Sequence, residues 1–241
     1  MNLSRLIVIA LNAILPLFGN ALYSEIATAQ PENNRRTFAD WCHQKADLSP
    51  ETKHTVDVLL KEAGTTECNE ADRKLSSLTE LDLSVNEIGD IKPLASLTNL
   101  TRLWLSGNEI GDIKPLASLT NLTELDLGVN EIGDIKPLAS LTNLTRLWLS
   151  SNEIGDIKPL ASLTNLTELD LGVNQIGDIK PLASLTNLTE LDLIDNQIGD
   201  IKPLASLTNL TDLYLSGNPI APKTCPLSPE SICKWEPPPK P

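Results

Sequence analysis

Apolar residues return at the same places every 22 residues over most of this chain. From Leu78 to Asn209 one phrase is written six times, as Leu-Thr-x-Leu-x-Leu-x-x-Asn-x-Ile-Gly-Asp-Ile-Lys-Pro-Leu-Ala-Ser-Leu-Thr-Asn, and a partial seventh copy ends at Ile220. Near the start of each copy, leucines alternate with polar residues, as Leu81 and Leu83 do in the first. A period of two indicates a strand with one buried face, so we predict one short strand per copy.

The second half of each copy predicts a return path to the next strand. Pro93 is expected to begin a short turn or 3-10 helix, with the side chain of Asp90 as its cap. Each copy then adds the same seven aliphatic side chains to one core. In the first copy these are Leu78, Leu81, Leu83, Ile88, Ile91, Leu94 and Leu97.

One polar residue recurs where each predicted strand ends. An asparagine amide both donates and accepts, so stacked copies can satisfy the backbone groups of neighbouring repeats as a ladder. We therefore interpret this position as structural rather than catalytic. Its occupants are Asn86, Asn108, Asn130, Asn152, Asn174, Asn196 and Asn218.

A period of 20 to 29 residues with Leu-x-x-Leu-x-Leu-x-x-Asn is typical of leucine-rich repeats. We predict an α/β solenoid, a right-handed superhelix with a parallel β-sheet on its concave side and short 3-10 helices or turns on its convex side. Such an array needs caps, because an end repeat would expose its core to water. The predicted domains are a signal peptide (1–29), a helical cap (30–77), the repeats (78–220), and a C-terminal cap with a Pro-rich tail (221–241).

The N-terminal cap carries its own helix signals. Ser49 followed by Pro50 is a typical helix start, and Gly64 is a typical helix end. A second short helix is expected over residues 69–75.

The first residues resemble an export signal. Arg5 precedes an apolar stretch over residues 6–17, and a small-x-small pattern places cleavage before Gln30. The apolar stretch is short for a membrane span, so we expect no span once the signal is removed. The alternative is an uncleaved N-terminal anchor. We predict that the protein is secreted, or lies in the periplasm or cell envelope.

Four cysteines flank the repeats, which suggests disulfides in an oxidising compartment. Three pairings are possible. Local pairing, Cys42 with Cys68 and Cys225 with Cys233, is favoured because the array holds its two ends apart. The alternative, a metal site that includes His43 or His54, matches no zinc spacing. We expect neither a metal nor a cofactor.

Three segments resemble a known family. The phrase over residues 88–99, Ile-Gly-Asp-Ile-Lys-Pro-Leu-Ala-Ser-Leu-Thr-Asn, is similar to internalin-type leucine-rich repeats of bacteria. Residues 63–68 of the cap and 218–226 of the tail resemble exported cyanobacterial repeat proteins. The resemblance implies that the protein binds other proteins through its concave strand face. No immunoglobulin-like domain or cell-wall sorting motif follows the repeats here, so it does not imply host invasion.

The charge of the chain narrows the range of partners. There are 32 acidic and 19 basic residues, which gives a net charge of −13. Such a charge repels nucleic acid and favours a basic protein partner. The alternative function is that of an acidic structural or cation-binding protein of the envelope or matrix.

The outward positions of the strands differ between repeats and predict the binding site. Trp104, Trp148 and Tyr214 are the only aromatic residues of the repeats, and all three occupy one outward position. Trp, Tyr and Arg dominate interface energetics. The alternative is a charge ladder that stabilises the sheet without a ligand. The predicted partner-binding residues are Arg102, Trp104, Glu124, Asp126, Arg146, Trp148, Asp170, Asp192 and Tyr214.

Nothing in the sequence predicts catalysis. It holds no Ser/His/Asp set, Gly-rich phosphate loop or His-Glu-x-x-His motif, and His43 and His54 both lie in the cap. A carboxylate pair such as Asp126 and Asp170 would lie on a wet strand face, which does little to separate their pKa values. We expect no enzyme.

Overall fold

Eight parallel strands form one open sheet in chain order, which is the predicted leucine-rich repeat solenoid. The computed structural model describes residues 36–236, so the predicted signal peptide (1–29) and the end of the Pro-rich tail (237–241) lie outside the described residues. The strands are β1 (Glu80–Asp82), β2 (Arg102–Trp104), β3 (Glu124–Asp126), β4 (Arg146–Trp148), β5 (Glu168–Asp170), β6 (Glu190–Asp192), β7 (Asp212–Tyr214) and β8 (Cys233–Lys234).

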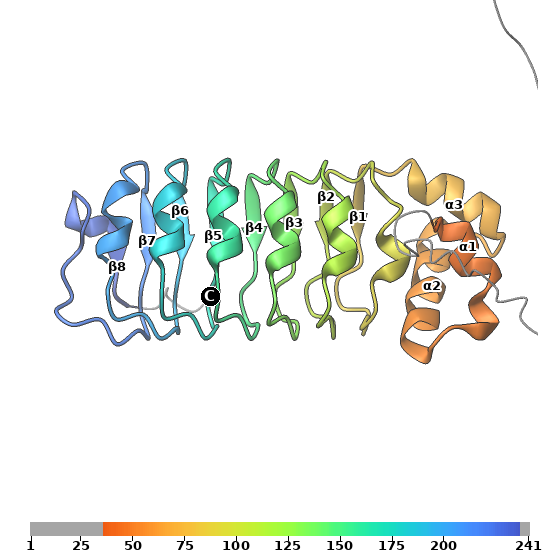
Figure 1. Ribbon diagram of the computed structural model, residues 1–241, viewed down its shortest axis with the longest axis horizontal. Helices are drawn as coiled ribbons and strands as arrows, with labels where there is room; N and C mark the ends of the chain where they lie inside the picture. The colour runs from red at the N-terminus through yellow and green to blue at the C-terminus, as the bar shows by residue number, and fades with distance from the viewer. Residues whose placement is uncertain (1–35, 237–241) are drawn as a thin grey trace, which may run out of the picture. The chain divides into compact units, whose positions relative to one another are not determined.

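The return path of each repeat is a 3-10 helix that contains the predicted proline. Figure 1 shows these helices as a row in front of the strands. The carboxylate of Asp90 accepts a hydrogen bond from the backbone N–H of Lys92 (2.9 Å), and later repeats do the same. The helices are η2 (Lys92–Leu94), η3 (Lys114–Ser118), η4 (Lys136–Ser140), η5 (Lys158–Ser162), η6 (Lys180–Ser184) and η7 (Lys202–Ser206).

The core between strands and 3-10 helices is aliphatic and continuous. Leucine and isoleucine fill the seven inward positions, and nearly all of these side chains are less than 3% exposed. Leu78 differs from its equivalents, since it is half-buried whereas Leu100 and Leu122 are fully buried. The reason is position: no repeat precedes Leu78 to cover it.

The predicted asparagine ladder is confirmed. Asn152 is 9% exposed, and its amide donates to the carbonyl oxygens of Leu127 (2.9 Å) and Leu149 (3.1 Å). Its side-chain oxygen accepts from the backbone N–H of Ile132 (3.0 Å). One side chain therefore joins two successive repeats.

Three helices cover the first repeat: α1 (Phe38–His43), α2 (Pro50–Ala63) and α3 (Cys68–Ser76). Ser49 caps α2 and Gly64 ends it in the left-handed conformation, as the sequence predicts. Helix α1 was not predicted from the sequence, and it begins with a capping box between Thr37 and Asp40. The disulfide between Cys42 and Cys68 joins α1 to α3. Two 3-10 helices complete the described elements, η1 (Lys45–Asp47) and η8 (Glu230–Ile232).

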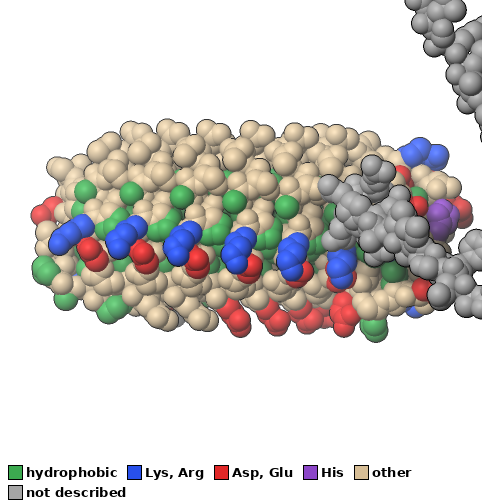
Figure 2. All heavy atoms as spheres, viewed as in Figure 1, with side chains coloured by type: hydrophobic (Ala, Val, Ile, Leu, Met, Phe, Trp, Pro, Cys, Tyr) green, Lys and Arg blue, Asp and Glu red, His purple; other side chains and the backbone are tan. Residues whose placement is uncertain are grey.

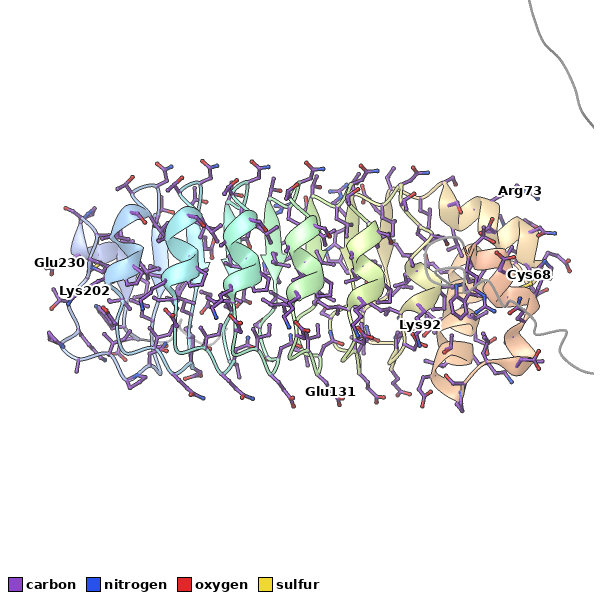
Figure 3. The ribbon with its side chains drawn as sticks, in the orientation of Figure 1. Cys68, Arg73, Lys92, Glu131, Lys202 and Glu230 are labelled. Carbon is purple, nitrogen blue, oxygen red and sulfur yellow. A yellow bond between two sulfur atoms is a disulfide. The ribbon has the colours of Figure 1, made fainter. Side chains whose placement is uncertain are left out.

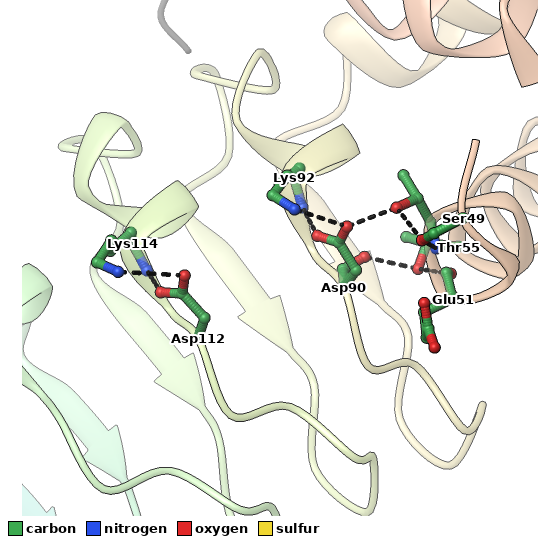
Figure 4. Close-up of polar contacts among 8 residues, drawn as sticks. Ser49, Glu51, Thr55, Asp90, Lys92, Asp112 and Lys114 are labelled. Atoms are coloured by element: carbon green, nitrogen blue, oxygen red, sulfur yellow. Dashed lines mark hydrogen bonds and ion pairs between the residues drawn. The ribbon is translucent and has the colours of Figure 1, made fainter. Parts of the chain in front are cut away.

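Helix α2 is bound to the first repeat by polar contacts around Asp90 (Figure 4). Thr52 donates to the Asp90 carboxylate (2.5 Å) and Thr55 donates to its backbone carbonyl oxygen (2.7 Å). An imidazole nitrogen of His54 lies 2.6 Å from the carbonyl oxygen of Asn86. The cap is therefore held to the repeats by directional bonds as well as by apolar contact.

The C-terminal segment adds a strand that the sequence did not predict. In β8, Cys233 pairs with Leu213 and Lys234 pairs with Tyr214 of β7. A disulfide joins Cys233 to Cys225, which is the local pairing. The last repeat is thereby covered at its edge. No helix among residues 36–236 is long and apolar enough to cross a membrane.

The residue before each ladder asparagine has a left-handed backbone, with φ between 51° and 74°. Glycine adopts this conformation freely, but a β-branched residue does so at a cost. Valine nonetheless occupies the position in the first, third and fifth repeats, and Val85 is 80% exposed. The full set is Val85, Gly107, Val129, Ser151, Val173, Asp195 and Gly217.

Replacing Val85 by asparagine is expected to raise the free energy of unfolding by about 0.5–1 kcal/mol, because asparagine tolerates the left-handed region. Chemical denaturation measures the change. Val85→Thr is the matched control, since it keeps the β-branch and should bring no gain. Equal stability of the two variants would show that Val85 is not strained.

Candidate functional site

Two outward positions of the strands form straight columns across the sheet. The register sets each residue directly beside its counterpart 22 residues later. The first column contains Glu80, Arg102, Glu124, Arg146, Glu168, Glu190 and Asp212. The second column contains Asp82, Trp104, Asp126, Trp148, Asp170, Asp192, Tyr214 and Lys234.

The arginines of the first column pair with the glutamates before them. Arg102 forms an ion pair with Glu80, and Arg146 forms one with Glu124. The Glu124 side chain is only 14% exposed, so the arginine also covers it. These pairs match the alternative interpretation, a charge ladder that stabilises the sheet without a ligand. They leave both guanidinium groups partly exposed.

The two tryptophans of the second column differ in their hydrogen bonds. The indole N–H of Trp148 donates to the Glu168 carboxylate (2.9 Å), and the Arg146 guanidinium lies 5.8 Å from the Trp148 ring. The indole N–H of Trp104 donates no hydrogen bond to any residue among 36–236 and is not buried. Trp148 is thus fixed in orientation, whereas Trp104 keeps a donor for a ligand.

A depression of about 370 Å³ lies between the tryptophans. Trp104 and Trp148 form its walls together with Val129, and Asp126 and Asp170 add carboxylates. Both indole rings are half-buried, and neither belongs to the aliphatic core. The depression therefore offers apolar surface beside negative charge.

The aspartates of the second column have a structural task that the sequence analysis missed. Asp126 accepts from the backbone N–H of Gly128, and Asp170 accepts from that of Gly172 (both 2.9 Å). Asp192 does the same with Ile194 (2.8 Å). This hydrogen bond to the residue two places on is an Asx turn that ends the strand. The sequence signal that could have predicted this bond is an aspartate two residues before the turn in these repeats. Each carboxylate keeps its second oxygen for other partners.

Carboxylates face one another in the C-terminal part of the sheet. Glu190 lies beside Glu168, and Asp192 lies beside Asp170. Burial raises the pKa of Asp192 to about 6, and repulsion from Asp170 and Glu190 adds to this, although the bond from Ile194 opposes it. Burial and then Glu168 also raise the pKa of Glu190. We call residues 168, 170, 190, 192 and 212 the acidic flank.

Replacing Asp192 by asparagine is expected to stabilise the protein by about 1 kcal/mol at pH 7, after allowance for solvent screening. A raised folded pKa means that the folded state binds the proton more tightly. Wild-type stability therefore falls as the pH rises from about 4 to about 6, and the variant lacks that loss. Asparagine can still accept the bond from Ile194.

Melting curves of both proteins at pH 4 and pH 7 test this. Asp82→Asn is the matched control, because Asp82 faces Trp104 rather than a carboxylate. A gain at pH 7 that persists at pH 4 would show that ionisation of Asp192 is not its cause.

The opposite face carries charged side chains of both signs. Figure 2 shows a row of Lys side chains, each beside an acidic one, and Figure 3 labels Lys92 and Lys202 in this row. Lys92 pairs with Asp90 (3.1 Å) and Lys114 pairs with Asp112 (3.4 Å), and the next two repeats repeat the pair. These pairs repeat uniformly along the face, but a second row of acidic side chains covers only its N-terminal part (Figure 2), because this position changes from Glu87, Glu109, Glu131 and Glu153 to Gln175 and Gln197.

The structure brings most of the predicted binding residues together. Arg102, Trp104, Glu124, Asp126, Arg146 and Trp148 lie on three adjacent strands. Asp170 and Asp192 follow on the next two strands. Tyr214 lies three strands beyond Trp148, so it does not join the tryptophan pair and lies between Asp192 and Lys234. Sequence reasoning missed Val129, which lines the depression. Among residues 36–236, no three His, Cys, Asp or Glu side chains group as metal ligands would.

The sequence matches the family of leucine-rich repeats (two copies) over more than half its length, at residues 76–118, 98–140, 120–162, 142–184 and 186–227. Internalin C2 from Listeria monocytogenes has a similar structure, with a TM-score of 0.66 and 36% identity over 73% of this chain and 88% of that chain. An internalin (inlF) from the same organism gives a TM-score of 0.64 and 42% identity over 68% of this chain. This chain spans 49% of the second protein. No curated protein matches.

Proposed function

The chain belongs to the internalin-type leucine-rich repeat family, and we propose that it is a non-enzymatic protein-binding module whose site is the strand face around Trp104 and Trp148. The family supports the general role, because leucine-rich repeat proteins such as internalins are typically binding modules. The location of the proposed binding site is supported by the depression between two half-buried tryptophans. Exposed apolar surface of this kind marks interaction sites.

Charge supports a partner with basic groups next to the tryptophans. The acidic flank begins one strand after Trp148, and its carboxylates exceed the cations that face them. Arg102 and Arg146 are already paired within the face. A partner with lysine or arginine on one side of its contact would therefore gain in association rate and specificity.

The location of the protein is proposed on the same grounds. Two disulfides and the similarity to internalins fit an extracellular protein. Disulfides persist in oxidising compartments and are rare in the cytosol. We therefore propose that the partner is met outside the cytoplasm.

The double variant Trp104→Ala with Trp148→Ala tests the proposed site. The folded variant is expected to lose a partner that the wild type retains when the immobilised protein is exposed to secreted and envelope fractions. Lys114→Ala with Lys158→Ala is the matched control, since these exposed lysines lie in the same two repeats on the opposite face. This control should retain the partner.

Two outcomes would contradict the proposal. Retention of the same partners by the tryptophan variant would place the site elsewhere. A melting temperature that rises with millimolar calcium, and does so less in Asp192→Asn, would favour the cation-binding alternative.

A further inference from the structure

The repeat pattern places two tryptophans and a carboxylate at equal intervals along one line. Trp104, Trp148 and Asp192 lie in the second column on β2, β4 and β6, so each is two strands from the next. Neighbouring strands are about 4.8 Å apart, which makes the interval about 9.6 Å. A ligand that runs across the strands and contacts all three needs side chains with that spacing on one side.

Polyproline II is the regular backbone that has this spacing. It has three residues per turn and a rise of about 3.1 Å per residue, so every third side chain faces one way at intervals of about 9.3 Å. In a β-strand, the side chain three residues further on faces the opposite side. Two turns of α-helix span about 10.8 Å, so over the two intervals a helical side chain would miss the position of Asp192 by more than about 2 Å.

We propose that the strand face binds a polyproline II segment of a partner protein, with prolines three residues apart at Trp104 and Trp148 and a basic residue three places further on at Asp192. This inference rests on the proposed function, because it takes the same strand face as the binding site and adds the conformation and the charge of the partner segment that binds there. The segment runs along the repeats and across the strands.

The surroundings of the tryptophans suit such a ligand. Proline rings pack against aromatic side chains in grooves that recognise polyproline II, and the depression between the indoles provides such a groove. The backbone carbonyl groups of this conformation make no internal hydrogen bonds, so they need outside donors. The indole N–H of Trp104 has no acceptor within the described part of the chain and is not a buried atom there, so it is accessible to a ligand.

The position of the basic residue follows from the carboxylates around Asp192. One Asp192 oxygen accepts from Ile194, whereas the other has no donor among residues 36–236. Asp170 and Glu190 are its acidic neighbours. Burial and this repulsion raise the Asp192 pKa, so a lysine or arginine placed there would stabilise the ionised form.

Synthetic peptides test the spacing. The first has proline at positions one and four, arginine at position seven and glutamine elsewhere. Two peptides of the same composition place either the second proline or the arginine one position later. Isothermal titration of the full chain should show binding of the first peptide and at least about 5-fold weaker binding of both shifted peptides, as expected for one misplaced contact of about 1 kcal/mol.

Two protein variants locate the contact. Asp192→Asn should weaken the first peptide about 5-fold and remove the penalty for moving the arginine. Asp82→Asn is the matched control, since Asp82 ends its strand with the same bond but lies one strand before the first proposed contact, Trp104, and at the end of the segment away from the basic residue. Its affinity should stay within about 2-fold of the wild type. Circular dichroism melts establish that both variants are folded.

The outcomes separate this inference from the proposed function. No binding, or equal affinity for all three peptides, overturns the polyproline II inference. If a protein partner still depends on Trp104 and Trp148 in that case, the proposed function stands with a ligand of different shape. If the tryptophan double variant binds the first peptide as well as the wild type does, the peptide binds outside the tryptophan site and the polyproline II inference is wrong, whereas loss or retention of the protein partner by the same variant decides the proposed function.

Discussion

Replacing Asn152 by leucine is expected to lower the free energy of unfolding by about 3 kcal/mol, as several buried groups lose their partners. The amide of Asn152 serves the carbonyl oxygens of Leu127 and Leu149 and the backbone N–H of Ile132. Leucine has a similar volume but no polar atoms, so these groups would remain buried and unpaired. Denaturation in urea measures the change.

Asn143→Leu is the matched control for this prediction. The Asn143 amide also donates to a carbonyl oxygen of the preceding repeat, that of Thr120 (2.9 Å), but the residue is exposed. Water can replace its bond, so a loss below about 1 kcal/mol is expected. Equal losses in the two variants would show that burial does not decide the value of the ladder. Because repeats interact only with their neighbours, the unfolding curve of Asn152→Leu is also expected to broaden.

Removing the N-terminal disulfide, by Cys42→Ala with Cys68→Ala, should cost about 3.5 kcal/mol in the chain-entropy description. The bond closes a segment of 26 residues and joins α1 to α3. Its loss would let the helices separate and would expose the leucines of the first repeat. Thermal melts of the variant, and of the wild type with and without a reductant, measure the effect.

The C-terminal disulfide provides the comparison. Cys225 and Cys233 are eight residues apart, so replacing both by alanine should cost about 2.5 kcal/mol. The two double variants therefore differ by about 1 kcal/mol in the stated order. A larger loss at the C-terminal end would mean that β8, rather than the helical cap, limits the stability of the repeats.

The repeated part of the fold could be predicted because it is over-determined. Every copy supplies the same leucines, the same asparagine and the same proline, so one interpretation of the strand fixes all seven. The same regularity gave the two outward columns, because a parallel register of 22 residues follows from the repeat itself. The asparagine ladder followed from hydrogen-bonding capacity alone.

The unrepeated parts could not be predicted in this way. Helix α1 has six residues, too few for a periodic pattern, and its signal is a capping box. Strand β8 has two residues and depends on β7 for its pairing. The half-burial of Leu78 and the bonds of Asp90 to α2 depend on what lies next to the first repeat, which the repeat phrase does not contain.

The site was only partly predictable for a related reason. The sequence indicated which side chains point outward, but it did not show that each aspartate of the second column bonds to the backbone two residues on. It also did not show that Trp148 is oriented by Glu168. Those contacts depend on side-chain conformations that neighbouring strands determine together.

The uniform joint between repeats has a consequence for how such a chain can change its length. Each repeat meets the next through the same buried side chains and the same ladder bonds, so excision or duplication of 22 residues creates no new kind of joint. The alternation in the outward columns has a longer period of 44 residues, because a Glu/Asp repeat is followed by an Arg/Trp repeat. A change of 44 residues keeps each arginine directly after the glutamate with which it pairs, as Arg102 follows Glu80 and Arg146 follows Glu124. Lengthening by that step would add one more tryptophan at the same interval, so the array would accommodate a longer ligand whose side chains have the same spacing.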